Sequence, residues 1–494
     1  MKLKTKFLDW YAGLPVAMMN KKTAAKMGVN TRGRISLKTN SDESSEYSTL
    51  VDIIEGLVKE DEIAISKEMK EKMGLKKEGQ EVDVNLTGSP YSLNYIKKKL
   101  ESKRLSKEEV ESIISDIVGN ELSQPETSLF VSAMYVNGMT FKETTYLIDA
   151  IVKQGHTLNL GNKIVADKHS IGGIPGNRTT PLVVSICAAA GLTMPKNSSK
   201  AITSAAGTAD TVETLTNVEF SVKELEKIVK KAGASLAWGG SVGMVPADSK
   251  IIRVEKMIQL DPRAQLLASI MSKKLAVGSN HIIIDIPYGS TAKVTKKEAE
   301  KLRQEFNKLG KHYKIEIKVV LTKADGPIGR GIGPVLEMKD ILGILNPEEK
   351  GPRDLEDKSV FLAGNLLEMS EKAEKGKGEQ KAREILHSGE AFEKFKEIIK
   401  SQGGKIKDLK SGSYKEEIYA GKSGKIKNVD NQLVNSVARN AGCPADKKAG
   451  ICLEISKGEK VKKNEKLFTI FAESKSRLEA AKNFCKEHNP VEIE

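Results

Sequence analysis

Two short segments rich in glycine, hydroxyl groups and lysine are the part of the chain best suited to chemistry. The first is Lys168-His169-Ser170-Ile171-Gly172-Gly173, and the second runs from Ser198 to Asp210 as Ser-Ser-Lys-Ala-Ile-Thr-Ser-Ala-Ala-Gly-Thr-Ala-Asp. Small residues let backbone N–H groups approach an anion, hydroxyls add directed donors, and lysine adds positive charge. We therefore expect a phosphate site. Neither segment is a P-loop, so the phosphate need not belong to a triphosphate.

His169 is one of only six histidines and lies between Lys168 and Ser170, in what we expect to be a glycine-rich loop after a strand. A structural role is as common for a histidine, but a core histidine has no reason to lie inside an anion cradle. A bound phosphate would favour the charged imidazolium, which suits a general acid. Downstream, Arg178, Thr179 and Thr180 precede Pro181 and predict a helix start. Such a start is either another anion contact or a simple cap, and the two interpretations are compatible.

A third candidate segment runs from Asp261 to Lys274. We expect Asp261 to be the N-cap of a helix on which Ser269 and Lys273, four residues apart, share one face. An amphipathic helix with a polar outer side is an equally simple interpretation. Against it, Ser269 lies within an apolar run and needs a polar partner there.

Composition excludes several classes of function. The net charge is +14, but the lysines alternate with glutamates and aromatic residues are sparse, so a nucleic-acid partner is not expected. No apolar stretch reaches the roughly 20 residues that span a bilayer, and Asp9 and Pro15 interrupt any leader-like run, which predicts a cytoplasmic protein without membrane contact. The four cysteines lack C-x-x-C spacing and are expected to be reduced, with no metal site.

The chain predicts a multidomain α/β protein. Short apolar runs over residues 1–84 indicate a small β-rich domain, and capping boxes at Ser106 and Thr140 begin amphipathic helices that form an all-α unit. Strands and helices then alternate, which is typical of a mainly parallel sheet whose ligands collect at the carboxyl ends of its strands. The glycines at 326–333 favour a tight turn over a dinucleotide site. The last 80 or so residues indicate an α+β domain.

Three ordered motifs resemble the thymidine and pyrimidine-nucleoside phosphorylase family over roughly residues 90–490. They are Lys-His-Ser-x-Gly-Gly at 168–173, Ser-Ser-Lys-Ala-Ile-Thr-Ser-Ala-Ala-Gly-Thr-Ala-Asp-Thr-Val-Glu at 198–213, and Ala-Ser-Ile-Met-Ser-Lys-Lys at 268–274. The N-terminal domain, the insertion at 173–180 and the Ser199–Ser204 string are most similar to an archaeal branch that cleaves nucleoside 5′-monophosphates. Where many pyrimidine enzymes carry Ser-Gly-Arg, this chain has Ser198-Ser199-Lys200, which suits a second phosphate on the substrate.

The resemblance implies a domain layout and a reaction. The layout is an N-terminal domain at 1–84, an all-α domain at 85–160 plus 246–277, a phosphate-binding α/β domain at 161–245 plus 278–410, and a C-terminal α+β domain at 411–494. In the implied reaction, phosphate attacks C1′ of the ribose and the base leaves, so AMP gives adenine and ribose 1,5-bisphosphate, with CMP and UMP as further candidates. No cofactor or metal is implied, because phosphate is itself a substrate. Relatives associate through the helical domain, so a homo-oligomer is expected.

The resemblance also implies site residues. Asp261 matches the proton donor of the branch acting on monophosphates, and His169 matches the histidine beside the base in the pyrimidine enzymes; we favour Asp261 and keep His169 as the rival. The matched phosphate positions are Lys168, Ser170, Thr180, Ser198 and Thr208. The positions matched to the base and nucleotide are Ser269, Lys273, Gly173, Ser199, Lys200, Ala201, Ile202, Thr203, Ser204, Thr208 and Lys293.

Three functions therefore stand at this point. The first is phosphorolysis of a nucleoside monophosphate, AMP above the others. The second is phosphorolysis of free pyrimidine nucleosides such as thymidine or uridine. The third is a non-catalytic nucleotide-binding scaffold, against which the intact cradle residues argue.

Overall fold

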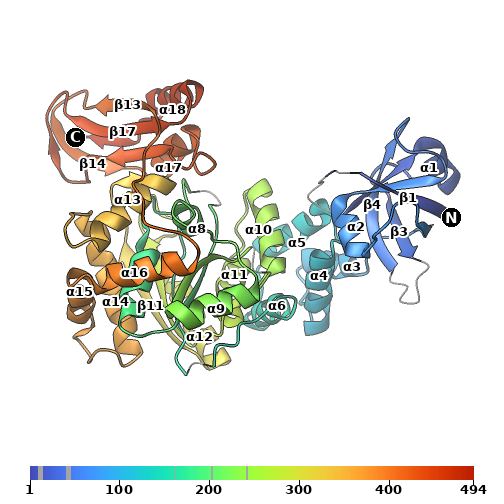
Figure 1. The fold of residues 1–494 in the computed structure, drawn as a ribbon, viewed down its shortest axis with the longest axis horizontal. Helices are drawn as coiled ribbons and strands as arrows, with labels where there is room; N and C mark the ends of the chain where they lie inside the picture. Colours follow the sequence, from blue (N-terminus) through green and yellow to red (C-terminus); the bar gives the residue numbers. More distant parts are fainter. Residues whose placement is uncertain (9, 11–14, 40–45, 162, 202–203, 241–242) are drawn as a thin grey trace. The chain divides into compact units, whose positions relative to one another are not determined.

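The computed structural model describes residues 1–8, 10, 15–39, 46–161, 163–201, 204–240 and 243–494, and the chain forms two compact units (Figure 1). One unit contains Met1–Gln154 and Pro246–Leu266, and the other contains Gly155–Val245 and Leu267–Glu494. Within the described ranges, every helix is too short or too polar to cross a membrane. The expected multidomain α/β architecture is confirmed, and each unit is considered separately below.

The N-terminal strands close into a six-stranded barrel in the order β1-β5-β2-β4-β3-β6. Alternating residues such as Leu3, Ile35, Leu37, Val82 and Val84 fill its core, as period-two patterns require. Its elements are β1 (Lys2–Phe7), β2 (Val16–Asn20), α1 (Lys21–Met27), β3 (Arg34–Thr39), β4 (Glu46–Ile54), β5 (Glu62–Ile65), α2 (Lys67–Met73) and β6 (Glu81–Leu86).

Five helices complete the first unit. The capping boxes expected at Ser106 and Thr140 are confirmed, with Glu109 and Glu143 each returning a hydrogen bond to the cap. The predicted stripe of α4 is buried at Val110, Ile113, Ile114 and Ile117. The helices are α3 (Ser92–Leu100), α4 (Lys107–Gly119), α5 (Gln124–Asn137), α6 (Phe141–Lys153) and α10 (Pro246–Ile258).

A parallel sheet forms the centre of the second unit. β11, β10 and β7 pair in that order, β8 pairs with β9, and a bridge between Val165 and Thr193 joins β7 to β8. The strands are β7 (Ala166–Ser170), β8 (Met194–Ser198), β9 (Ala234–Trp238), β10 (His281–Tyr288) and β11 (Glu316–Lys323). β7 is thus a central strand, which places its carboxyl end where ligands of such sheets collect.

Helices surround this sheet, and one apolar core joins most of them to it. Leu182, Val183 and Ile186 of α7 pack with Leu362 and Leu366 of α14 in that core. The helices are α7 (Thr179–Ala189), α8 (Thr208–Val212), α9 (Val222–Ala232), α11 (Arg263–Ala276), α12 (Lys296–Tyr313), α13 (Pro334–Leu345), α14 (Arg353–Met369), α15 (Gly378–His387) and α16 (Glu390–Ser401).

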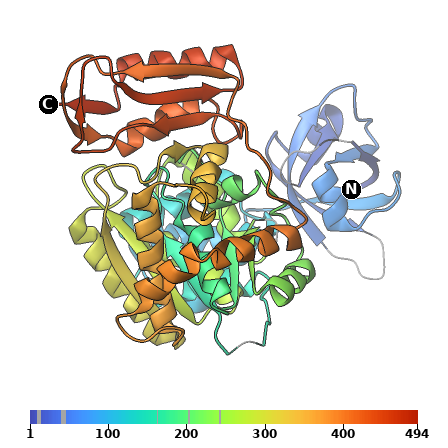
Figure 2. The ribbon, with the colours of Figure 1, turned by 60° about the vertical axis from the view of Figure 1, so that its left-hand side comes forward.

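The C-terminal domain is an α+β layer of small sheets and two helices (Figure 2). Its four-stranded sheet, in the order β12-β15-β17-β13, includes β12 from the α/β domain, so the two domains share a sheet. The tight turn expected before α13 is therefore followed by a strand that pairs across domains. The elements are β12 (Gly331–Ile332), β13 (Tyr414–Tyr419), β14 (Gly424–Val429), α17 (Asn431–Asn440), β15 (Gly450–Leu453), β16 (Lys460–Val461), β17 (Lys466–Ala472), α18 (Lys475–Glu487) and β18 (Val491–Ile493).

Candidate active site

Lys168, His169 and Ser170 lie on strand β7 and not in a loop, which corrects the expectation from the sequence. They pair in parallel with Ile283, Ile284 and Asp285 of β10. The glycine-rich loop begins only at Ile171. The end of this strand was predicted too early because its last residues are polar. In the structure, their side chains contact other polar groups instead of an apolar core.

The side chain of Lys168 is buried against the first turn of α7. Its Nζ donates to the hydroxyl of Thr179 at 2.5 Å and lies 3.4 Å from that of Thr180, with 1 % of the residue exposed. Burial lowers the pKa of this lysine to about 7. An anion arriving here would favour the ammonium form, because opposite charges stabilise each other in a site shielded from water. The structure thus brings together Lys168 and Thr180.

Ser170 belongs to a second polar cluster at the same sheet edge. Its hydroxyl donates to Asp285 at 3.0 Å and lies 3.4 Å from the amide nitrogen of Asn177. Asp285 also pairs with Lys358 at 2.9 Å and accepts a hydrogen bond from Thr322 at 2.6 Å. Although burial opposes ionisation, Lys358 and Lys168 keep the pKa of Asp285 below its usual value. Ser170 is therefore held by a fixed carboxylate.

Ser198 and Thr208 flank the second segment. Ser198 ends β8, and its Oγ is buried without a hydrogen-bond partner among the described residues, which is unusual for a buried hydroxyl. Thr208 begins α8 and accepts a hydrogen bond from Arg178 at 3.2 Å. Arg178 also donates to the carbonyl of Ala206 at 2.8 Å and to Glu337 at 2.6 Å. Arg178 thus ties the loop after β7 to the loop after β8.

The loop after β8 is fixed at its two ends by one carboxylate. Asp210 Oδ2 accepts the backbone N–H of Ala201 at 2.6 Å and that of Gly207 at 2.9 Å. A Cβ on Gly207 would lie 2.4 Å from the carbonyl oxygen of Ser199, so only glycine fits there. The hydroxyl of Ser204 donates to Ala206 at 2.9 Å. Ile202 and Thr203, also expected in the site, lie outside the described residues.

Lys200 does not point an unpaired charge at this loop. Its ammonium contacts Glu213 at 3.0 Å and Glu219 at 3.1 Å, and it lies 4.4 Å from the centre of the Trp238 ring. These contacts hold the side chain against the domain, and a substrate phosphate would have to compete with two carboxylates for it.

Gly173 and Lys293 come together from different loops. Gly173 has a φ of +92°, and a Cβ built on it would lie 2.9 Å from Cβ of Lys293 and 3.2 Å from its backbone nitrogen. The loop after β7 and the loop after β10 are therefore in van der Waals contact, and a larger residue at 173 would separate them.

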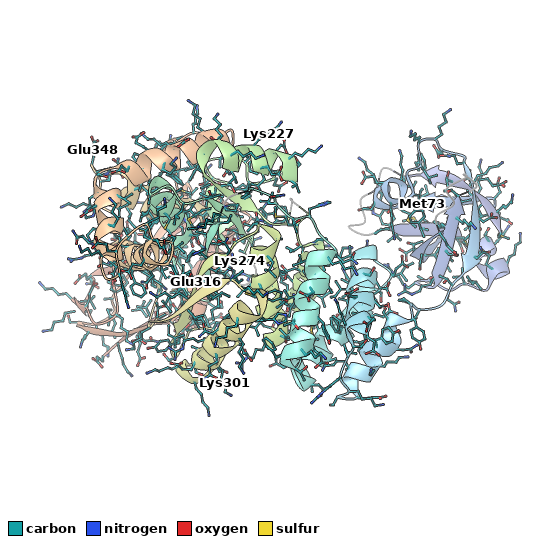
Figure 3. The ribbon with its side chains drawn as sticks, turned by 90° about the horizontal axis from the view of Figure 1, so that it is seen from below. Met73, Lys227, Lys274, Lys301, Glu316 and Glu348 are labelled. Atoms are coloured by element: carbon teal, nitrogen blue, oxygen red, sulfur yellow. The ribbon has the colours of Figure 1, made fainter. Side chains whose placement is uncertain are left out.

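His169 lies beside an unusual concentration of buried lysines. Asp167 accepts hydrogen bonds from Lys196 at 3.1 Å and from Lys274 at 2.7 Å. Burial, together with these lysines and Lys273, lowers the pKa of His169 well below its usual value, so its imidazole is neutral at neutral pH. Figure 3 labels Lys274 inside the α/β domain. The expected imidazolium is not favoured in the structure as described.

Ser269 and Lys273 of α11 contact each other as their spacing predicts. The Nζ of Lys273 donates to the Ser269 hydroxyl at 2.7 Å and to its carbonyl at 3.2 Å. This pair supplies the polar partner that Ser269 needs within its apolar run.

Asp261 is exposed and belongs to the first compact unit, whereas the residues described above belong to the second. α11 begins at Arg263, so Pro262 directly precedes the helix and Asp261 lies one residue further out. The carbonyl of Pro262 accepts the N–H of Leu266 at 2.9 Å and so opens the helix.

Several residues that organise the site were missed from the sequence. One signal was available: Asp285 is a carboxylate inside an otherwise apolar strand, and a buried charge requires partners. The remaining partners come from distant segments and follow no local pattern: Glu337, Lys358, Asp167, Lys196 and Lys274. Across the described ranges, no group of three or more His, Cys, Asp or Glu residues is arranged to hold a metal ion.

Comparison with known protein families identifies the class of enzyme to which the chain belongs. Residues 93–155 match the helical bundle domain of a glycosyl transferase family, residues 162–392 match its a/b domain, and residues 425–492 match the pyrimidine nucleoside phosphorylase C-terminal domain. The anthranilate phosphoribosyltransferase of Thermus thermophilus shares the fold, with a TM-score of 0.52 and 18 % identity, covering 63 % of this chain and 99 % of that one. The protein thus belongs to the pentosyltransferase class of enzymes.

Full-length relatives narrow the class further. An AMP phosphorylase of Pyrococcus horikoshii is 48 % identical over 93 % of this chain and 91 % of its own length, and one of Pyrococcus abyssi is 47 % identical over 100 % and 98 %. An AMP phosphorylase of Methanococcus aeolicus is 40 % identical over 100 % and 97 %. The chain belongs to the AMP phosphorylase family.

Proposed function

We propose that this enzyme catalyses the phosphorolysis of AMP, with inorganic phosphate as the nucleophile and adenine and ribose 1,5-bisphosphate as products. The observation that carries the proposal is the buried side chain of Lys168, whose Nζ meets two threonine hydroxyls in the first turn of α7. Such a site suits an oxyanion. Ser170, Ser198 and Thr208 line the same sheet edge, and the buried, unpaired hydroxyl of Ser198 suits a donor to phosphate.

The reaction requires opposite charges on the two sides of the glycosidic bond. As the bond breaks, the ribose gains positive character and the base gains negative charge. Phosphate held at Lys168 would stabilise the ribose and attack C1′, while a proton donor would neutralise the departing base. We propose Asp261 as that donor. The neutral state of His169 argues against the rival donor, because a neutral imidazole is a poor acid although it can still donate a hydrogen bond.

We propose that the remaining matched residues hold the nucleotide. Gly173, Lys293 and the loop at 199–204 would surround its 5′-phosphate, since backbone N–H groups and hydroxyls there suit a second anion. Ser269 and Lys273 would contact the base. Lys200 would act mainly by holding the loop against Trp238, given its pairing with Glu213 and Glu219.

A substrate panel tests the proposed function. AMP, CMP, UMP, adenosine and uridine are each incubated with and without phosphate, and free base is measured by chromatography. We expect phosphate-dependent release of adenine from AMP faster than release of any other base. Faster release from uridine would favour the pyrimidine-nucleoside alternative, and absence of phosphate-dependent release from every compound would favour a binding scaffold.

We also propose that the enzyme is a homo-oligomer. Large apolar side chains are exposed on α5 and at the start of α6, namely Leu129, Tyr135, Val136 and Phe141, with Val136 76 % exposed. Several exposed apolar side chains on neighbouring helices are typical of a contact between subunits. Sedimentation of the purified chain would give the number of subunits.

A further inference from the structure

Helix α17 of the C-terminal domain contacts two loops of the α/β domain. The Asn435 side-chain oxygen accepts the backbone N–H of Ala205 at 3.0 Å, and the Asn431 amide nitrogen donates to the Thr291 hydroxyl at 2.9 Å. The two asparagines are four residues apart and therefore lie on one face of the helix. They are buried, with 0 % of Asn431 and 9 % of Asn435 exposed. One helix face thus holds the loop after β8 and the loop after β10.

Ala205 is part of the core of the C-terminal domain although it belongs to the loop after β8. It is 1 % exposed and packs in the same apolar cluster as Val434 and Ala438 of α17. The Ala205 methyl group and N–H are therefore both held by the C-terminal domain. A shift of that domain would carry this part of the loop with it.

Lys447 links the C-terminal domain to the loop after β8 in a second way. Its ammonium contacts Asp210 at 3.1 Å and Glu213 at 2.7 Å. Asp210 is the carboxylate that fixes the loop at Ala201 and Gly207. Lys447 neutralises and orients this carboxylate, so it acts on the loop through Asp210 and not by touching the loop itself.

The loop after β10 connects this arrangement to the glycine-rich loop after β7. Thr291, held by Asn431, lies two residues before Lys293, whose backbone and Cβ are in close contact with Gly173. The C-terminal domain therefore supports the loop after β8 at Ala201, Ala205 and Gly207, and the loop after β10 beside Lys293. No contact in this set involves Lys168 or the groups around it.

We propose that Asn431, Asn435 and Lys447 are positioning residues of the C-terminal domain that set the preference of the site for a 5′-phosphorylated nucleotide over the free nucleoside. The inference rests on the proposed function. Donors that are already fixed around an anion bind it without an ordering cost, whereas a mobile loop must be ordered on binding. A nucleoside lacks the 5′-phosphate and does not depend on that order.

The test compares two variants with two matched controls in the full chain. Asn435→Ala removes the hydrogen bond to Ala205, and Lys447→Met removes the ion pair with Asp210. Asn440→Ala lies on the same helix and removes a hydrogen bond to the Ser436 carbonyl of that helix, and Lys448→Met changes the neighbouring lysine, which pairs with Glu473. The measured quantities are kcat/KM for AMP and for adenosine, KM for phosphate, and Tm.

We expect Asn435→Ala and Lys447→Met each to lower kcat/KM for AMP about ten-fold, the loss expected for one well-placed hydrogen bond or ion pair. The value for adenosine and KM for phosphate should stay within about two-fold, and the two controls should match wild type. An equal loss for AMP and adenosine, or unchanged selectivity in both variants at a normal Tm, would overturn the proposal.

Calorimetric Kd values for AMP and adenosine separate this inference from the proposed function. If wild type releases no adenine from AMP, the proposed function fails, yet the ratio of the two Kd values still tests the positioning role. The ratio should move toward one in Asn435→Ala and stay at the wild-type value in Asn440→Ala. A ratio unchanged in Asn435→Ala would overturn the inference whatever the activity.

Discussion

At the scale of single residues, burial determines what the charged groups of the site can do. Lys168, Asp167, Lys196 and Lys274 are almost completely removed from solvent. Two ammonium groups share the carboxylate of Asp167, and the excess positive charge lies beside His169. Inorganic phosphate and the 5′-phosphate of the proposed substrate would balance this positive charge, because opposite charges attract strongly away from water.

Binding of phosphate should be coupled to proton uptake by Lys168. Because its pKa is lowered to about 7, this lysine is mostly neutral in the free enzyme at about pH 8.5 and becomes charged beside a dianion. Calorimetry in buffers of different ionisation enthalpy should show an uptake approaching one proton. Lys168→Arg, whose side chain stays protonated, should show almost none. Equal uptake in both proteins would contradict this assignment.

Mutation should show which of the two candidate residues is the proton donor. Asp261→Asn should lower kcat for AMP by about a hundred-fold or more, with little change in Kd for AMP, because an amide cannot supply the proton. His169→Asn, which keeps a hydrogen-bond donor, should lower kcat less. Near-normal turnover in Asp261→Asn would transfer the role to His169.

At the scale of elements, the candidate site combines the carboxyl end of β7 with the loops that follow β7, β8 and β10. These loops are held together by side chains: Arg178 joins the first two, and the contact between Gly173 and Lys293 joins the first and third. The elements themselves are stabilised by ordinary cores and caps. The chemistry therefore depends on a few cross-loop contacts more than on any one helix or strand.

Gly173→Ala tests one of these contacts. A methyl group at this position would lie 2.9 Å from Cβ of Lys293, and the φ of +92° is strained for alanine, so the loop after β10 must move. We expect KM for AMP to rise by about ten-fold or more while KM for phosphate changes little. Gly172→Ala, which has a φ of +84° but no atom within 4 Å of the added carbon, is the matched control for strain alone.

Elements marked by local chemistry were predictable from the sequence, and those made by distant contacts were not. The boxes at Ser106 and Thr140 identified helix starts, because a cap and its partner lie three residues apart. β2 carries no such local signal, since Val16, Ala17 and Met19 are buried without a clean alternation. The polar end of β7 was taken for a loop because its strand partner, β10, lies more than 100 residues later in the chain.

The candidate site shows the same division. Lys168, Thr180 and the Ser269–Lys273 pair were found from residue type and spacing, and the structure brings each pair of groups together. Asn435 and Lys447 could not be found, because nothing in their local sequence indicates contact with residues more than 200 positions earlier. Tertiary structure alone supplies that information.

At the scale of the whole molecule, positive charge is in excess, with a net charge of +14. The labelled Lys227 and Lys301 in Figure 3 are examples of exposed lysines on helices of the α/β domain. Excess charge of this kind raises the local concentration of anionic substrates and steers them inward.

The rate of capture of AMP should therefore fall with salt. Between about 0.05 and 0.5 M KCl, kcat/KM for AMP should decrease several-fold because added ions screen the field, while kcat at saturation changes little. Adenosine, which is uncharged, serves as the comparison at constant phosphate. A salt effect of the same size on both substrates would contradict steering of AMP.

The identity of the nucleophile tests the central claim most directly. AMP is mixed with enzyme and phosphate, and the reaction is followed by phosphorus NMR together with chromatography of the base. The account predicts that adenine appears only with phosphate, with one phosphate consumed and one bisphosphorylated ribose formed for each adenine released. Adenine released without phosphate, with ribose 5-phosphate as the sugar product, would show that water is the nucleophile and would contradict it.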